Sequence, residues 1–171
     1  MVVRRLAVVL GILLIPTAAY ADGHRAGLFG GYSRANQGSW LNGAHFSVEC
    51  VLTRQVCRNT KTDSYIYVAA DYSFHDGEGF KRQVFLVGGN AQKKWKNVTA
   101  SGRLLVGSVW GDGAANFSWS TGATFQIVPS ETSALSNRPH VVPHAQVDYI
   151  VRTGSPKSFA RISIGAMIKF P

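Results

Sequence analysis

Hydrophobic and polar residues alternate along most of the chain, and the clearest case is the last stretch, from Phe159 to Phe170. Its even-numbered positions are all apolar, whereas its odd-numbered positions include Arg161, Ser163 and Lys169. In a β-strand, alternate side chains point to opposite faces of the sheet. The pattern therefore predicts a strand of about 10–12 residues with one wholly apolar face, a length that suits a tilted bilayer crossing.

The rest of the chain repeats this alternation in segments separated by turn-forming residues. The predicted strands are Ala26–Arg34, Ala44–Leu52, Tyr65–Phe74, Arg82–Gln92, Thr99–Trp110, Phe117–Ile127, Pro143–Arg152 and Phe159–Phe170. The predicted turns and loops between them include Ala35–Gly43, Thr53–Ser64, Lys93–Val98 and Val128–Val142. About eight strands joined in order by turns predict an all-β fold, a membrane-spanning up-and-down antiparallel β-barrel.

The composition of the two faces indicates which one meets lipid. The apolar rows hold many Phe, Trp, Tyr and Ile side chains, too much volume for the lumen of an eight-stranded barrel, so we expect them to point outward. The polar rows carry full charges that we expect to point inward and to form ion pairs: Glu49, Asp71, Arg103, Asp148, Arg152 and Arg161. A soluble secreted barrel that holds an apolar ligand is the alternative, and it requires the opposite arrangement.

Aromatic residues lie near many of the predicted strand ends. Aromatic side chains at both bilayer interfaces anchor transmembrane barrels. The expected anchors are Tyr32, Phe46, Phe74, Trp95, Trp110, Phe117, Tyr149 and Phe170.

The N-terminus has the features of a secretory signal. Arg4 and Arg5 precede the short apolar run Leu6–Ile15, and Ala19-Tyr20-Ala21 forms a cleavage site. The run is too short for a spanning helix. We therefore predict a cleaved signal peptide at residues 1–21 and one barrel domain at residues 22–171, which is 171 − 21 = 150 residues.

Three short motifs resemble the small outer-membrane β-barrels of the OmpA/OmpX type. They are Phe29-Gly30-Gly31-Tyr32-Ser33, Gln146-Val147-Asp148-Tyr149 and the closing Lys169-Phe170. The resemblance implies a barrel in the bacterial outer membrane, folded by the barrel-assembly machinery, with both chain ends in the periplasm. The loops Thr53–Ser64 and Val128–Val142 then lie on the periplasmic side, and the outer loops are short.

Other chemistry in the sequence is sparse. The formal net charge is +9, or +7 without Arg4 and Arg5, but the basic residues are scattered and an exported barrel does not meet nucleic acid. The histidines lack a metal-binding spacing, and no Ser/His pair stands out, so we predict no metal, no cofactor and no catalytic residue. Whether Cys50 and Cys57 form a disulfide in the oxidising exported compartment stays open.

The predicted function is that of a non-enzymatic outer-membrane barrel with a structural, envelope or surface-interaction role. Inward charges of opposite sign are expected to plug the lumen, because buried charges must be paired. The expected partners are outer-membrane lipid and lipopolysaccharide, together with the barrel-assembly machinery during folding. The alternatives are a narrow ion or solute channel and a lipid-modifying outer-membrane enzyme.

Overall fold

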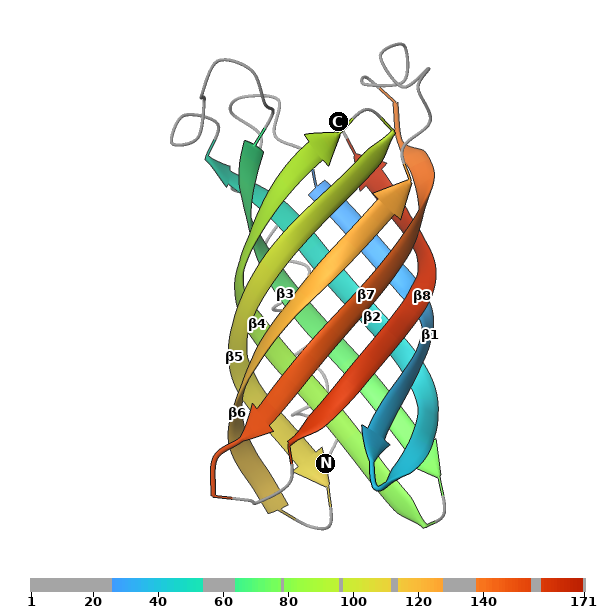
Figure 1. The fold of residues 1–171 in the computed structure, drawn as a ribbon, viewed down its shortest axis with the longest axis vertical. Helices are drawn as coiled ribbons and strands as arrows, with labels where there is room; N and C mark the ends of the chain where they lie inside the picture. Colours follow the sequence, from blue (N-terminus) through green and yellow to red (C-terminus); the bar gives the residue numbers. More distant parts are fainter. Residues whose placement is uncertain are drawn as a thin grey trace, which may run out of the picture.

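The computed structural model is a closed antiparallel barrel in which each strand pairs with its sequence neighbours and the last strand pairs with the first (Figure 1). It describes residues 26–53, 64–77, 79–95, 97–111, 114–127, 138–154 and 158–170. The strands are β1 (Ala26–Gln37), β2 (Ser39–Thr53), β3 (Ser64–Gly77), β4 (Phe80–Trp95), β5 (Val98–Gly111), β6 (Ala114–Ile127), β7 (His140–Arg152) and β8 (Phe159–Phe170). The predicted fold class, strand number and strand order are confirmed. No helix in the described ranges is long and apolar enough to cross a membrane.

The two ends of the barrel differ in what they carry. Ala26 pairs with Phe170, so β1 begins and β8 finishes at the same end, which we call the terminal end. The opposite end, which we call the hairpin end, carries the connections β1–β2, β3–β4, β5–β6 and β7–β8. The β1–β2 connection there is the single residue Gly38.

Side chains alternate between the lumen and the outer surface, as the sequence predicts. On β5, Arg103 and Leu105 are buried, at 3% and 0% exposure, whereas Leu104 between them is 60% exposed. The same alternation leaves large apolar side chains outside on every strand, such as Phe125 at 50% exposure. The soluble-barrel alternative needs these apolar rows inside, so the structure contradicts it.

Several strands extend beyond the predicted limits. Most of the predicted turn Ala35–Gly43 is strand, and the turn itself is confined to Gly38, whose φ of 86° suits glycine. Gly43 remains within strand β2 and lies very close to the backbone of β3. A Cβ at this position would lie 1.8 Å from the Phe74 carbonyl oxygen, so only glycine fits. The glycine- and asparagine-rich composition of this segment indicated a turn. In the barrel, pairing with neighbouring strands keeps its backbone extended.

The same correction applies at the terminal end. Strand β4 continues into the predicted turn Lys93–Val98 as far as Trp95, which pairs with Val98. Strand β7 begins at His140, inside the predicted loop Val128–Val142. Cross-strand hydrogen bonding extends both segments, because tertiary pairing overrides the local composition that suggested a turn.

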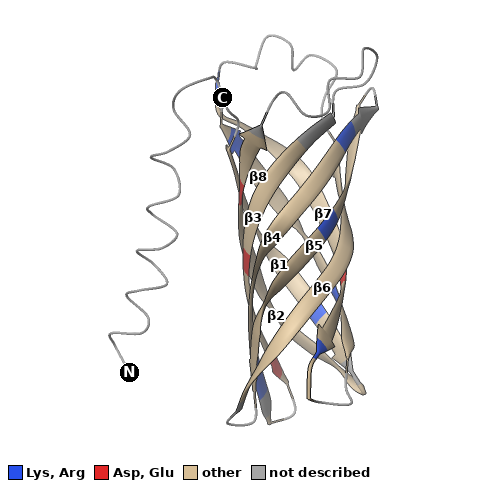
Figure 2. Ribbon diagram, turned by 90° about the vertical axis from the view of Figure 1, so that its left-hand side faces the viewer, with Lys and Arg blue, Asp and Glu red and all other residues tan. Residues whose placement is uncertain are grey.

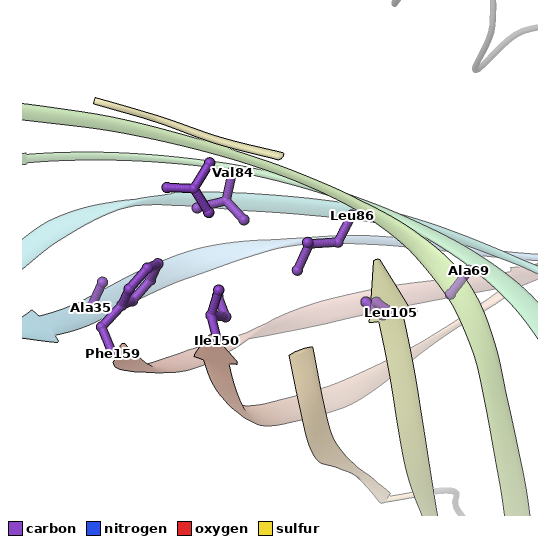
Figure 3. Close-up of a cluster of buried hydrophobic side chains, with 8 residues drawn as sticks. Ala35, Ala69, Val84, Leu86, Leu105, Ile150 and Phe159 are labelled. Atoms are coloured by element: carbon purple, nitrogen blue, oxygen red, sulfur yellow. The ribbon is translucent and has the colours of Figure 1, made fainter. Parts of the chain in front are cut away.

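The lumen is filled by side chains, and a large group of them is apolar. One cluster lies toward the hairpin end and comprises Ala35, Ala69, Val84, Leu86, Leu105, Val109, Ile150 and Phe159 (Figure 3). A smaller cluster of Phe29, Val142 and Met167 lies toward the terminal end. The lumen of an eight-stranded barrel is narrow enough to be filled in this way.

Candidate functional site

Four charged side chains from four different strands meet in the lumen. They are Asp71 on β3, Arg103 on β5, Asp148 on β7 and Arg161 on β8, and we call this group the ion-pair cluster. Each belongs to the inward row of its strand, and all four side chains are buried. Charged positions of both signs occur along the length of the barrel wall and not only at its ends (Figure 2).

Arg161 bridges the two carboxylates. Its Nε and Nη2 atoms donate to Asp148 Oδ2 at 3.0 and 2.6 Å, and Nη2 also donates to Asp71 Oδ2 at 2.7 Å. Its Nη1 atom donates to Ser73 Oγ at 2.9 Å. All three guanidinium nitrogens therefore have acceptors, as a buried arginine requires.

Arg103 approaches the same carboxylates from the other side. Its Nη2 lies 2.6 Å from Asp71 Oδ1, and its Nε lies 3.6 Å from Asp148 Oδ1. Gln146 Nε2 donates to Asp148 at 2.6 Å and to Asp71 at 3.2 Å, and His45 Nε2 lies 3.2 Å from Asp71 Oδ2. The formal charges of the cluster cancel, so burial of these ions is compensated.

Gly122 provides the space through which Arg103 reaches Asp148. In the β5–β6 and β6–β7 registers, Gly122 lies opposite Arg103 on one side and opposite Asp148 on the other. A Cβ at Gly122 would lie 2.4 Å from Asp148 Oδ1 and 2.4 Å from the Val147 carbonyl oxygen. Glycine is therefore part of the site, although it supplies no functional group.

We expect Gly122→Ala to destabilise the barrel by about 1–3 kcal/mol, because the added methyl group overpacks a filled lumen. The matched control is Gly89→Ala on the outer surface, where a Cβ would meet nothing within 4 Å. The control should change stability by about 0.5 kcal/mol or less. Urea unfolding of both variants in lipid vesicles measures the difference, and equal stability would show that the space at Gly122 is not needed.

A chain of hydrogen bonds runs from the ion-pair cluster toward the hairpin end. His45 Nδ1 lies 3.0 Å from Ser163 Oγ, Ser163 Oγ donates to Ser33 Oγ at 3.0 Å, and Ser33 Oγ lies 2.9 Å from His75 Nε2. Gly43 lies between Ser33 and His75 in the register, as Gly122 does between Arg103 and Asp148. Inward glycines thus let side chains on strands two apart meet.

Asp71, His45 and Ser163 have the contacts of a Ser-His-Asp nucleophilic triad. Each of the three residues is 0% exposed in the filled lumen. These three side chains therefore belong to the packed polar lumen of the described barrel.

The other two predicted ion-pair residues lie outside the cluster. Glu49 is buried and accepts a hydrogen bond from Asn90 Nδ2 at 2.9 Å, whereas Arg152 is half-buried at the end of β7. No salt bridge joins either of them to another residue in the described ranges. Glu49 nevertheless lies near Arg103, because its partner Asn90 pairs with Arg103 in the β4–β5 register. Arg152 is the last residue of β7, four positions beyond Asp148.

The predicted aromatic anchors whose side chains the structure describes occupy the outer surface. Five of them are exposed: Tyr32, Phe46, Trp110, Phe117 and Tyr149. Phe74 and Phe170 are half-buried on the outward rows of β3 and β8. The Trp95 side chain lies outside the described part of the structure. Trp40, Trp119 and Phe125 are further outward aromatics, at 43%, 38% and 50% exposure, which the sequence analysis did not single out.

Some predictions fall outside the described residues. Residues 1–21, the predicted signal peptide, and Cys57 are among them, and Cys50 has no disulfide partner within the described ranges. Among the described residues, no group of His, Cys, Asp or Glu side chains is arranged to hold a metal ion.

Sequence reasoning missed the neutral members of the site. Three of them contact the charged residues directly: Ser73, His45 and Gln146. The fourth is Gly122, which lies between Arg103 and Asp148 in the register. The available signal for Ser73, His45 and Gln146 was parity, because each lies an even number of positions from a charged inward residue of its own strand: Asp71, Glu49 and Asp148. Parity alone does not say which inward residues share a level.

The closed barrel with a charged interior and an apolar exterior has the architecture of small outer-membrane barrels, and comparison with solved structures shows the same fold. The outer membrane enzyme PagL matches with a TM-score of 0.52 and 11% identity over 85% of this chain and 99% of its own. Neisserial surface protein A matches with a TM-score of 0.51 and 12% identity over 87% and 98%. Ail, the attachment invasion locus protein of Yersinia pestis, matches with a TM-score of 0.55 and 13% identity over 86% and 97%. No protein-family model and no curated protein sequence matches the chain.

Proposed function

We propose that this protein is a non-enzymatic, integral β-barrel of the bacterial outer membrane with a plugged lumen and a structural or surface-interaction role. The observation that supports the proposal is the direction of the two faces of the sheet: the charged face points into the lumen and the apolar face points outward. Arg161 and Asp71 are fully buried inside, whereas Leu104, Phe125 and Ile164 are 60%, 50% and 58% exposed outside. An apolar outer surface with a charged interior is stable in lipid and unfavourable in water.

Fractionation tests the location. The expressed protein should sediment with outer membranes and resist alkaline extraction, and it should migrate differently on gels before and after boiling. Recovery in the soluble periplasm would contradict the proposal.

The exported protein should also have the mass of a chain that begins at Asp22, because we propose that residues 1–21 are removed during export.

The proposed role follows from the state of the lumen and from the fold neighbours. The ion-pair cluster and the apolar cluster together leave the described lumen filled by side chains. Ail is by name an attachment and invasion protein, and this supports a surface-interaction role for a barrel of the same fold. PagL is an enzyme, but the buried Ser163 gives little support for enzymatic activity here. The proposed partners are outer-membrane lipid, lipopolysaccharide and, during folding, the barrel-assembly machinery.

In planar bilayers, we expect no steady ion conductance from the wild-type barrel. Arg161→Met should be equally silent, because the apolar cluster around Leu86 and Phe159 remains in place when the ion-pair cluster is disturbed. Current recordings of both proteins, with a known porin as positive control, provide the measurement. A reproducible unitary current through the wild-type protein would favour the narrow-channel alternative.

A further inference from the structure

Arg34 is a cation on the outer surface of β1, four residues before the β1–β2 turn at Gly38. It is exposed, and its neighbours in the register are Asn42 on β2 and Ile162 on β8. Within the described ranges no salt bridge joins Arg34 to a carboxylate. The nearest acidic position on this surface by register is Asp76, and Asn42 lies between them. A cation on a lipid-facing surface is costly unless it reaches the interface or meets an anion.

The guanidinium of Arg34 is directed toward the hairpin end. Its Cζ atom lies 5.0 Å from the centroid of the Trp40 ring, and Trp40 is 43% exposed. Trp40 pairs with Asn36, two residues closer to the β1–β2 turn than Arg34. Stacking on this ring holds the charge at the level where aromatic side chains meet the membrane interface.

A second contact presents further donors at the same place. Tyr32 Oη donates to Asn42 Oδ1 at 2.5 Å, so the amide oxygen is occupied and the amide NH₂ group remains as a donor. The indole N–H of Trp40 is also only a donor. The surface thus combines a guanidinium with neutral donors, which is the chemistry that binds a phosphate group.

We propose that Arg34, Trp40 and Asn42 bind a phosphate group of lipopolysaccharide in the outer leaflet. Below this group, toward the terminal end, Ile164, Leu28 and Ile168 are 58%, 43% and 40% exposed on β1 and β8 and would lie against the acyl chains. The proposal rests on the proposed function, because the hairpin end faces the outer leaflet only if the chain ends lie in the periplasm.

The test uses the purified full-length mature barrel, folded in detergent micelles, and measures binding of lipid A by native mass spectrometry and by tryptophan fluorescence. Arg34→Gln should weaken lipid A binding by about tenfold or more, the effect of losing a charge-assisted contact. The matched control is Lys81→Gln, which removes another exposed cation near the hairpin end, on β4, and should change the affinity by about twofold or less. Arg34→Lys should recover part of the affinity, since lysine keeps the charge but loses the planar donor geometry.

Two further ligands identify the source of the phosphate. Dephosphorylated lipid A should bind the wild-type protein as weakly as lipid A binds Arg34→Gln, and phosphatidylglycerol should bind less tightly than lipid A. Unchanged binding by Arg34→Gln, or equal binding of dephosphorylated lipid A, would overturn the site. Equal binding of phosphatidylglycerol would overturn its assignment to lipopolysaccharide. A heat-modifiable barrel in outer membranes with an inactive Arg34 site would contradict this inference alone, whereas a protein absent from outer membranes would contradict the proposed function.

Discussion

Replacing Arg161 with methionine is expected to destabilise the barrel by about 3–5 kcal/mol, the cost of breaking a buried ion pair by removing one partner. Arg161 donates to Asp148, Asp71 and Ser73 from a position with no exposure. Without it, Arg103 alone must compensate both carboxylates, and it lies 3.6 Å from Asp148. The measurement is a urea unfolding titration of the barrel folded in lipid vesicles.

The matched control for this variant is Arg152→Met, which removes a half-buried inward arginine with no salt bridge in the described part of the barrel. It should cost about 0.5 kcal/mol or less, as most substitutions away from such networks do. A similar loss in both variants would mean that removal of positive charge, and not the ion-pair cluster, determines stability.

Double-mutant cycles then assign the pairs within the cluster. Combining Arg161→Met with Asp148→Asn should recover part of the single-variant loss, with a coupling energy of about 0.5–3 kcal/mol. Arg103→Met should couple in the same way to Asp71→Asn, since the two side chains lie 2.6 Å apart. Its coupling to Glu49→Gln should be weaker, because Glu49 forms no salt bridge with Arg103 in the described ranges and instead contacts Asn90, the register neighbour of Arg103. Strict additivity with both aspartates would contradict the observed geometry.

Replacing Leu104 with arginine is expected to cost about 2–4 kcal/mol, as a charge does near the bilayer midplane. Leu104 lies in the middle of β5 and is 60% exposed on its outward face. Val98→Arg is the matched control, because Val98 lies on the same strand and face, at the terminal end, and is 43% exposed. It should cost only about 0–1 kcal/mol, since a charge near the interface reaches water.

Folding titrations of both variants into lipid vesicles give the two costs. A dependence on depth, with Leu104→Arg the more costly, is a property of a surface in lipid. Equal and small costs at Leu104 and Val98 would show that the outward face of β5 does not contact hydrocarbon, and they would remove the main support for a membrane location.

The strands and the direction of their side chains could be predicted from residue order alone. Alternation with a period of two is a local property of an extended backbone, so the positions of Arg103 and Leu104 on opposite faces follow from neighbours in the chain. The same reasoning gave Phe159–Phe170 its observed limits. Where glycines and polar residues interrupt the alternation, as at Gly43 and Lys93, only pairing with other strands showed that the backbone remains extended.

Which inward residues meet becomes clear only in the closed barrel. Contacts across the lumen depend on the register of strands far apart in sequence, and register sets the level of each side chain along the barrel axis. Asp71 and Asp148 share a level with Arg161, whereas Glu49, with the same parity, lies beside Asn90 instead. The role of Gly122 could not be predicted from the sequence either. Gly122 leaves space between Arg103 and Asp148, and these two residues become its neighbours only in the folded barrel.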